Sequence, residues 1–214
     1  MSTVLLLHGD ARIAESLREL IANTPGFEVV GVADSLSKAR EMLARGTPDL
    51  LLTDLMLPDG EVQPLLSQLR RNGRGDSPQL LVLAMSTDDP QLMDALCHGA
   101  DAYFTLSHSP AALLSAMQQV LNGESPILPS IAREVTAHFN AAAWDQTDFV
   151  GESQNPLRLS EADELLLELT SEGFLTSEVA QALQTSVHAV GVRTRNIYRK
   201  LQFDVRADAL SLAA

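Results

Sequence analysis

The basic residues between Ser186 and Leu201 are the side chains whose types and spacing point most directly to a chemical role. This stretch holds four Arg or Lys residues and no Asp or Glu, in a chain whose formal net charge is −13. Such a local reversal of charge suits a surface that binds the phosphates of nucleic acid. The plain alternative is an amphipathic helix with a solvated polar face.

Helical spacing divides this stretch into two faces. The inner face is largely apolar and holds Val187, Val190, Thr194, Ile197 and Leu201. The outer face and its flanks hold the candidate DNA-binding residues, namely His188, Val192, Arg193, Arg195, Asn196, Arg199 and Lys200. Because Arg195 lies away from the apolar positions, its side chain is expected to be exposed and free to reach DNA.

Two shorter helices are predicted ahead of this one. Leucines at helical spacing from Leu159 predict a first helix, which Gly173 ends. Thr176 is placed to cap a second helix, and Ser186 a third. A short helix, a tight turn and a further helix form an arrangement that presents one helix to the major groove.

These residues resemble the four-helix DNA-binding domain of the LuxR/NarL class of bacterial regulators. The matches include Leu159-Ser160, Gly173, Glu178-Val179-Ala180, Ser186-Val187, Asn196-Ile197, Arg199-Lys200-Leu201 and, in a last helix, Arg206 and Ala209. The resemblance implies that Gly191, Val192 and Arg195 take the base-contacting positions, with Arg195 donating two hydrogen bonds to guanine. The chain departs from the family at His188, Ala189, Gly191 and Arg193. Gly191 stands where the family usually has Lys, and glycine costs about 1 kcal/mol inside a helix.

The first half of the chain alternates apolar runs with amphipathic segments. The runs 4–8, 27–32, 49–54, 79–85 and 102–106 predict buried parallel strands, with helices near 11–23, 35–45, 60–72, 90–98 and 109–121. This order predicts an α/β doubly wound, five-stranded parallel sheet, followed by the small all-α helix-turn-helix domain. Function gathers at the carboxyl ends of such strands, which here are followed or ended by His8, Asp54, Ala84 and Leu106.

This half resembles the receiver domain of two-component response regulators. Residues 48–54, 57–60 and 99–103 match it, and the resemblance makes Asp54 the phosphoacceptor. Phosphoryl transfer to an aspartate needs acids that hold Mg²⁺, a Lys for the phosphoryl oxygens and a Ser or Thr hydroxyl. The family's acidic pair falls on His8 and Gly9, its Ser/Thr on Ala84 and its Lys on Leu106.

This degenerate receiver pocket predicts control by something other than aspartyl phosphate. Asp10 lies one residue late for the acidic pair, and Ser86 can still supply a hydroxyl. Asp54 is then a retained polar residue, or it forms a small metal or pH-sensitive site with His8 and Asp10. Tyr103 matches the aromatic that changes rotamer in working receivers, and a core aromatic is the alternative. We expect no cofactor and no catalytic residues.

The predicted domains are a receiver at 1–124, a linker helix and tether at 125–154, and the helix-turn-helix domain at 155–214. Ile131, Val135 and Phe139 share one face of the linker helix, and Trp144 lies near its end. No apolar run approaches the roughly 18 residues that cross a bilayer, and no basic leader precedes the first run. We therefore expect a cytoplasmic protein, whose single cysteine, Cys97, is a buried apolar residue.

The favoured interpretation is a DNA-binding transcriptional regulator, not an enzyme, that binds double-stranded DNA as a homodimer. One recognition helix reads few base pairs, and two-fold symmetry lengthens the site. A protein or small-molecule effector would act at the receiver. The alternative is an interaction protein whose receiver docks on a partner and whose weakened third helix, with Gly191, no longer reads sequence.

Overall fold

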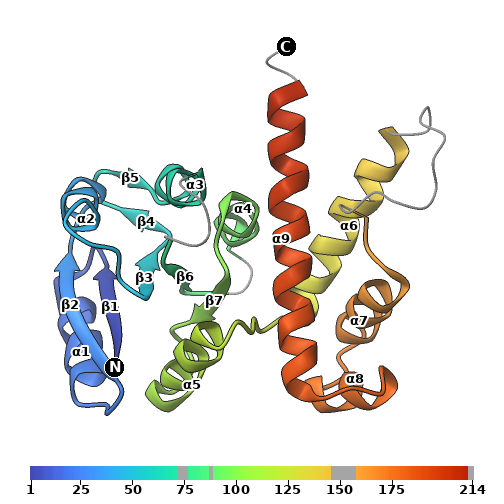
Figure 1. Cartoon of the computed structure of the whole chain (residues 1–214), viewed down its shortest axis with the longest axis horizontal. Coiled ribbons are helices and arrows are strands. Elements are labelled where there is room, and N and C mark those ends of the chain that lie inside the picture. The colour runs from blue at the N-terminus through green and yellow to red at the C-terminus, as the bar shows by residue number, and fades with distance from the viewer. Residues whose placement is uncertain (72–76, 87–88, 146–157, 212–214) are drawn as a thin grey trace. The chain divides into compact units, whose positions relative to one another are not determined.

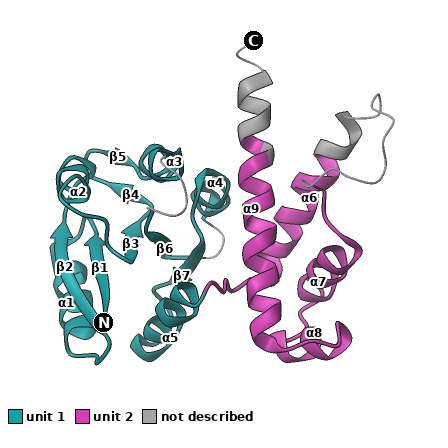
Figure 2. Cartoon of the chain, in the orientation of Figure 1, with its two compact units in different colours: residues 1–122 teal, residues 123–214 magenta. Residues whose placement is uncertain are grey.

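The computed structural model describes the backbone of residues 1–71, 77–86, 89–145 and 158–211. Two units make up the chain, Met1–Asn122 and Gly123–Ala214 (Figure 2). The helix expected in the linker is α6 (Pro129–Asp145), and it belongs to the second unit. The tether predicted to end at residue 154 falls on residues 146–157, outside the described part of the chain.

A five-stranded parallel sheet forms the centre of the first unit, which confirms the predicted fold class (Figure 1). The strands run in the order β2-β1-β3-β6-β7, with bounds β1 (Ser2–Leu7), β2 (Phe27–Ala33), β3 (Leu50–Asp54), β6 (Gln79–Ala84) and β7 (Ala102–Thr105). Because the strands are parallel, their carboxyl ends meet at one edge of the sheet. His8, Asp54 and Leu106 are thereby brought to the same edge.

Helices enclose both faces of the sheet, namely α1 (Ala11–Ala22), α2 (Leu36–Leu43), α3 (Gln63–Arg71), α4 (Pro90–His98) and α5 (Pro110–Leu121). On one face, strand residues such as Leu6, Leu52 and Leu83 pack with Leu17 of α1 and Met117 of α5. The alternate strand positions are buried as well. This two-sided burial is why the strands occur as continuous apolar runs instead of alternating ones.

A small hairpin that the apolar pattern does not predict follows β3. It pairs β4 (Met56–Leu57) with β5 (Gly60–Glu61), and two-residue strands are too short to produce a periodicity. The Asp59 carboxylate in its turn accepts hydrogen bonds from the backbone N–H groups of Leu36 (2.8 Å) and Ser37 (3.0 Å). These bonds lower the pKa of Asp59 and tie the hairpin to the start of α2.

The second unit is helical and consists of α6, α7 (Glu161–Ser171), α8 (Thr176–Ala182) and α9 (Val187–Ser211). The sequence prediction of a separate last helix is wrong here, because α9 continues through Arg206 and Ala209. No Gly or Pro lies between Leu201 and Ser211 to end the helix. The residue at the N-cap of α8 is Leu175, not Thr176, and the Glu178 carboxylate accepts from the Leu175 N–H.

Across the described residues, no helix is both long and apolar enough to span a membrane. The longest, α9, carries several charged side chains along its length. Cys97 is buried within α4, as its sequence context predicts.

We predict that Arg70→Ala lowers the free energy of unfolding by about 3–5 kcal/mol. The buried Arg70 guanidinium pairs with buried Asp101 and donates to the Gly99 carbonyl at 2.9 Å. Its loss leaves the Asp101 carboxylate without that cation. Arg71→Ala, at an exposed neighbouring position, should cost less than about 0.5 kcal/mol. Urea titrations of both full-length variants check this, and equal midpoints would contradict it.

Candidate receiver site and nucleic-acid interface

His8 and Asp54 lie together at the carboxyl edge of the sheet. The His8 ring is buried, and its Nε2 lies 3.7 Å from Asp54 Oδ2. The backbone N–H of Asp10 donates to His8 Nδ1 at 3.0 Å, which places the ring proton of the neutral form on Nε2, facing the carboxylate. An imidazole therefore occupies the position where the resemblance expects a metal-binding acid.

Asp10, which lies one residue after the positions that the resemblance assigns to the acidic pair, caps a helix. Its Oδ1 accepts hydrogen bonds from the N–H groups of Ile13 (3.2 Å) and Arg12 (2.8 Å) and so caps α1. These two bonds lower the pKa of the Asp10 carboxyl. At Gly9, an added Cβ would lie 3.2 Å from Pro58 Cδ, so a larger residue there must displace the hairpin.

The remaining positions of the pocket bear apolar side chains or lie at its margin. Ala84 is buried, and its carbonyl accepts from the Leu106 N–H at 2.9 Å. Tyr103 is 3% exposed, a burial that favours the core-aromatic alternative. Ser86 is exposed beyond the end of β6. Among the described residues, no cluster of three His, Cys, Asp or Glu side chains could hold a metal ion.

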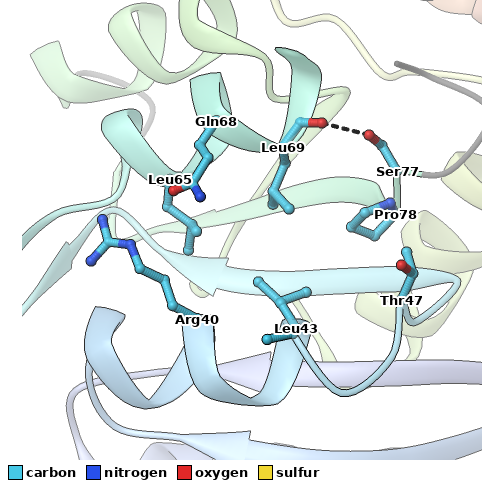
Figure 3. A pocket seen from close by; sticks show the side chains of 9 residues that line it. Arg40, Leu43, Thr47, Leu65, Gln68, Leu69, Ser77 and Pro78 are labelled. Atoms are coloured by element: carbon cyan, nitrogen blue, oxygen red, sulfur yellow. Dashed lines mark hydrogen bonds between the residues drawn. The ribbon is translucent and has the colours of Figure 1, made fainter. Parts of the chain in front are cut away.

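A separate hollow in the receiver lies between α2 and α3 (Figure 3). Its lining includes Arg40, Leu43, Leu65 and Leu69, and the Ser77 hydroxyl closes one side by donating to the Leu69 carbonyl at 2.6 Å. Part of its lining precedes β3 and β6. The hollow thus lies toward the amino ends of the strands, away from Asp54.

In the second unit, a tight turn joins α8 to α9. Gln184 in this turn has φ +51°, and Ser186 Oγ accepts from the Ala189 N–H at 3.1 Å, which confirms the predicted cap of α9. The expected inner face is confirmed for Val190, Thr194, Ile197 and Leu201, all 2% exposed or less. Val187 is an exception, since it begins the helix and is half exposed.

Two of the candidate DNA-binding side chains contact α7. Arg193 Nη1 lies 3.0 Å from Asp163 Oδ1, and Lys200 Nζ lies 2.7 Å from Asp163 Oδ2. Asp163 is buried and completes a capping box with Ser160. The sequence interpretation missed Asp163, although the Ser160-x-x-Asp163 spacing is the signature of such a box. Through these contacts with Asp163, Arg193 and Lys200 hold α9 against the first turn of α7.

The prediction that Arg195 is exposed is wrong, because its side chain is 3% exposed. Helical spacing places Arg195 on the same face as Gly191 and Tyr198. Both of these neighbours are bonded to the chain segment that precedes α6, so this face of α9 is covered. A helical wheel cannot reveal such a cover, because it arises from a distant part of the sequence.

The other candidate residues remain at least partly accessible. His188 and Asn196 are exposed, whereas Val192 and Arg199 are half-buried. Arg199 Nη1 donates to Asn196 Oδ1 at 3.2 Å, which joins these two side chains on one surface. The structure therefore leaves His188, Val192, Asn196 and Arg199 as the members of the predicted set that are at least partly accessible and do not contact Asp163.

A family model described as the response regulator receiver domain matches residues 4–118. The chain belongs to this family. As a response regulator it is similar along its length to two curated proteins. The nitrate/nitrite response regulator protein NarL of Escherichia coli is 26% identical over 97% of this chain and 93% of that protein. The DNA-binding transcriptional activator DevR/DosR of Mycobacterium tuberculosis is 27% identical over 100% of this chain and 94% of that protein.

Solved structures of response regulators share the fold. The RcsB response regulator of Salmonella typhimurium superposes with a TM-score of 0.53 at 20% identity, covering 94% of this chain and 91% of that one. A LuxR-family response regulator from Aurantimonas sp. gives a TM-score of 0.56 at 27% identity, covering 64% of this chain and 97% of that one.

The Asp163 cluster of this response regulator predicts a pH-dependent stability. Burial raises the pKa of Asp163, but bonds from Lys200, Ser160 and Arg193 outweigh that effect, so its pKa lies below 3.8. A carboxyl with a lowered pKa stabilises the fold above its ordinary value and loses that contribution as the pH falls. Asp163→Asn should therefore cost about 2 kcal/mol at neutral pH and less below pH 3.8.

Urea titrations of the full chain at neutral and acidic pH measure this difference. Glu161→Gln is the matched control, since Glu161 is exposed in the same first turn of α7. A pH-independent cost for Asp163→Asn, or an equal cost for the control, would show that the ionised cluster does not hold α9.

Proposed function

We propose that this protein is a DNA-binding transcriptional regulator of the NarL/LuxR type. The observation that carries the proposal is the helix-turn-helix formed by α8 and α9, with Ser186 capping α9 and Asp163 fixing its orientation. The near full-length match to NarL and to DevR/DosR supports it. Another neighbour, with a TM-score of 0.55, is RcsB in complex with DNA. A catalytic role is not part of this function.

We further propose that aspartyl phosphorylation does not control the protein. The support is the pairing of Asp54 with His8, the use of Asp10 as a helix cap, and the apolar side chain at Leu106. Phosphoryl transfer develops negative charge that Mg²⁺ and Lys must neutralise, and these positions supply neither. A protein or small-molecule effector at the receiver would replace that signal.

The working form on DNA is proposed to be a cytoplasmic homodimer. One α9 can reach only a few base pairs, so two-fold symmetry is needed to read a longer site. An interaction protein that no longer reads sequence is the second candidate function. Two observations favour it, the glycine at position 191 and the burial of Arg195.

We predict that acetyl phosphate with Mg²⁺ leaves the purified protein unmodified, because the acceptor lacks its metal-binding acids and its Lys. Intact-mass measurement before and after incubation checks this. Asp54→Ala is the matched control and should give the same mass change as the parent. Mg²⁺-dependent addition of one phosphoryl group to the parent, absent from Asp54→Ala, would overturn phosphorylation-independent control.

We predict that Arg199→Ala weakens binding to all duplex DNA and makes the salt dependence shallower by about one unit of slope. Arg199 is a partly accessible cation of α9, and no contact with Asp163 is found for it among the described side chains. Arg45→Ala, an exposed arginine of the receiver, is the charge-matched control and should leave the slope unchanged. Fluorescence anisotropy over a salt series measures both. Identical slopes would favour the interaction-protein function.

A further inference from the structure

The first residues of the second unit lie along α9. The Ser125 N–H donates to the carbonyl of Gly191 at 3.0 Å, and the Tyr198 hydroxyl donates to the carbonyl of Pro126 at 2.9 Å. The Glu124 carboxylate lies 2.9 Å from His188 Nδ1. Residues 124–126 thus contact about three turns of α9.

Gly191 makes this close approach feasible. A Cβ at position 191 would lie 3.0 Å from Glu124 Cβ and 3.1 Å from its Oε2, closer than a side chain ordinarily tolerates. A glycine inside a helix costs about 1 kcal/mol relative to alanine and would not be favoured there without a contact that requires it. The approach of Glu124 is such a contact.

The covered face is the one proposed to read DNA bases. His188, Gly191, Arg195 and Tyr198 recur at helical spacing and share this face. Arg195 and Tyr198 are buried on it, whereas His188, at its end, contacts Glu124 but stays exposed. The major groove is about 12 Å wide and admits one helix. A helix that carries a second chain segment on its base-reading side does not fit, so residues 124–126 and DNA exclude one another.

We propose that residues 124–126 act as a latch: they cover the base-reading face of α9 and thereby exclude DNA. Gly191 is the position against which Glu124 of the latch packs. This inference rests on the proposed DNA-binding function and adds a regulatory step to it. Glu124 follows the receiver's last helix α5 after only Asn122 and Gly123, and Gly123 has φ +81°. Because only two residues separate α5 from the latch, a conformational change in the receiver can displace the latch.

Each latch contact is weak enough to be reversible. A hydrogen bond exchanged with water contributes little net free energy, and the His188 side chain is 62% exposed, so water screens its contact with Glu124. A closed population lowers the apparent DNA affinity by the fraction of molecules that are open. Opening the latch by mutation should thus tighten DNA binding.

The test uses the full chain, a duplex enriched from a randomised DNA pool, and two variants. Gly191→Ala crowds Glu124 without weakening the helix, and Glu124→Ala removes the contact between Glu124 and His188. Both should bind the duplex roughly fivefold more tightly than the parent. Glu168→Ala removes the same charge from an exposed position on α7, and it controls for general electrostatics.

Hydrogen exchange at the Ser125 amide reports the latch itself. We expect this amide to be protected in the parent, and to lose protection in both variants and when the parent binds DNA. Faster Ser125 exchange with unchanged DNA affinity would overturn the latch while leaving the proposed function intact. A Ser125 amide that stays protected on DNA would also overturn the latch. Absence of DNA binding by the parent and by both variants would overturn the proposed function itself.

Discussion

The ionised Asp163 carboxylate is the interaction on which the geometry of the helix-turn-helix depends. It joins α7 to α9 through Arg193 and Lys200, at two positions about two helical turns apart on α9. Because both cations come from the same helix, they restrict its rotation as well as its distance from α7. The direction in which His188, Val192 and Asn196 face solvent follows from this restriction.

A second constraint acts at the carboxyl edge of the receiver sheet. Parallel strands bring His8 and Asp54 together whatever chemistry they perform. A buried imidazole beside a carboxylate supplies a proton donor where a family member would hold a divalent cation. The protein thus has the fold of the receiver family. We propose that aspartyl phosphate does not control it and that residues 124–126 link the receiver to DNA binding instead.

The fold could be predicted from the sequence because its signals are local and strong. Continuous apolar runs mark the strands, and the predicted cap Ser186 marks the beginning of α9. The β4–β5 hairpin escaped prediction because two-residue strands carry no period. The continuity of α9 escaped because the family resemblance suggested a break that no residue of this chain enforces.

The candidate site was predicted less completely, for a physical reason. Burial of a helix face depends on segments far away in the sequence, so spacing alone assigned Arg195 to solvent and Lys200 to phosphate. In the structure the Arg195 side chain is buried, and Lys200 Nζ contacts the Asp163 carboxylate. Helical periodicity identifies which residues share a face, but not what lies against it.

Hydroxyl-radical footprinting with the full-length protein and no phosphodonor tests the central claim most directly. Phosphorylation-independent DNA binding through α9 predicts two protected half-sites related by two-fold symmetry, with centres about one helical turn apart or a multiple of that spacing. Protection that requires a phosphodonor, or no protection on any duplex, would contradict it.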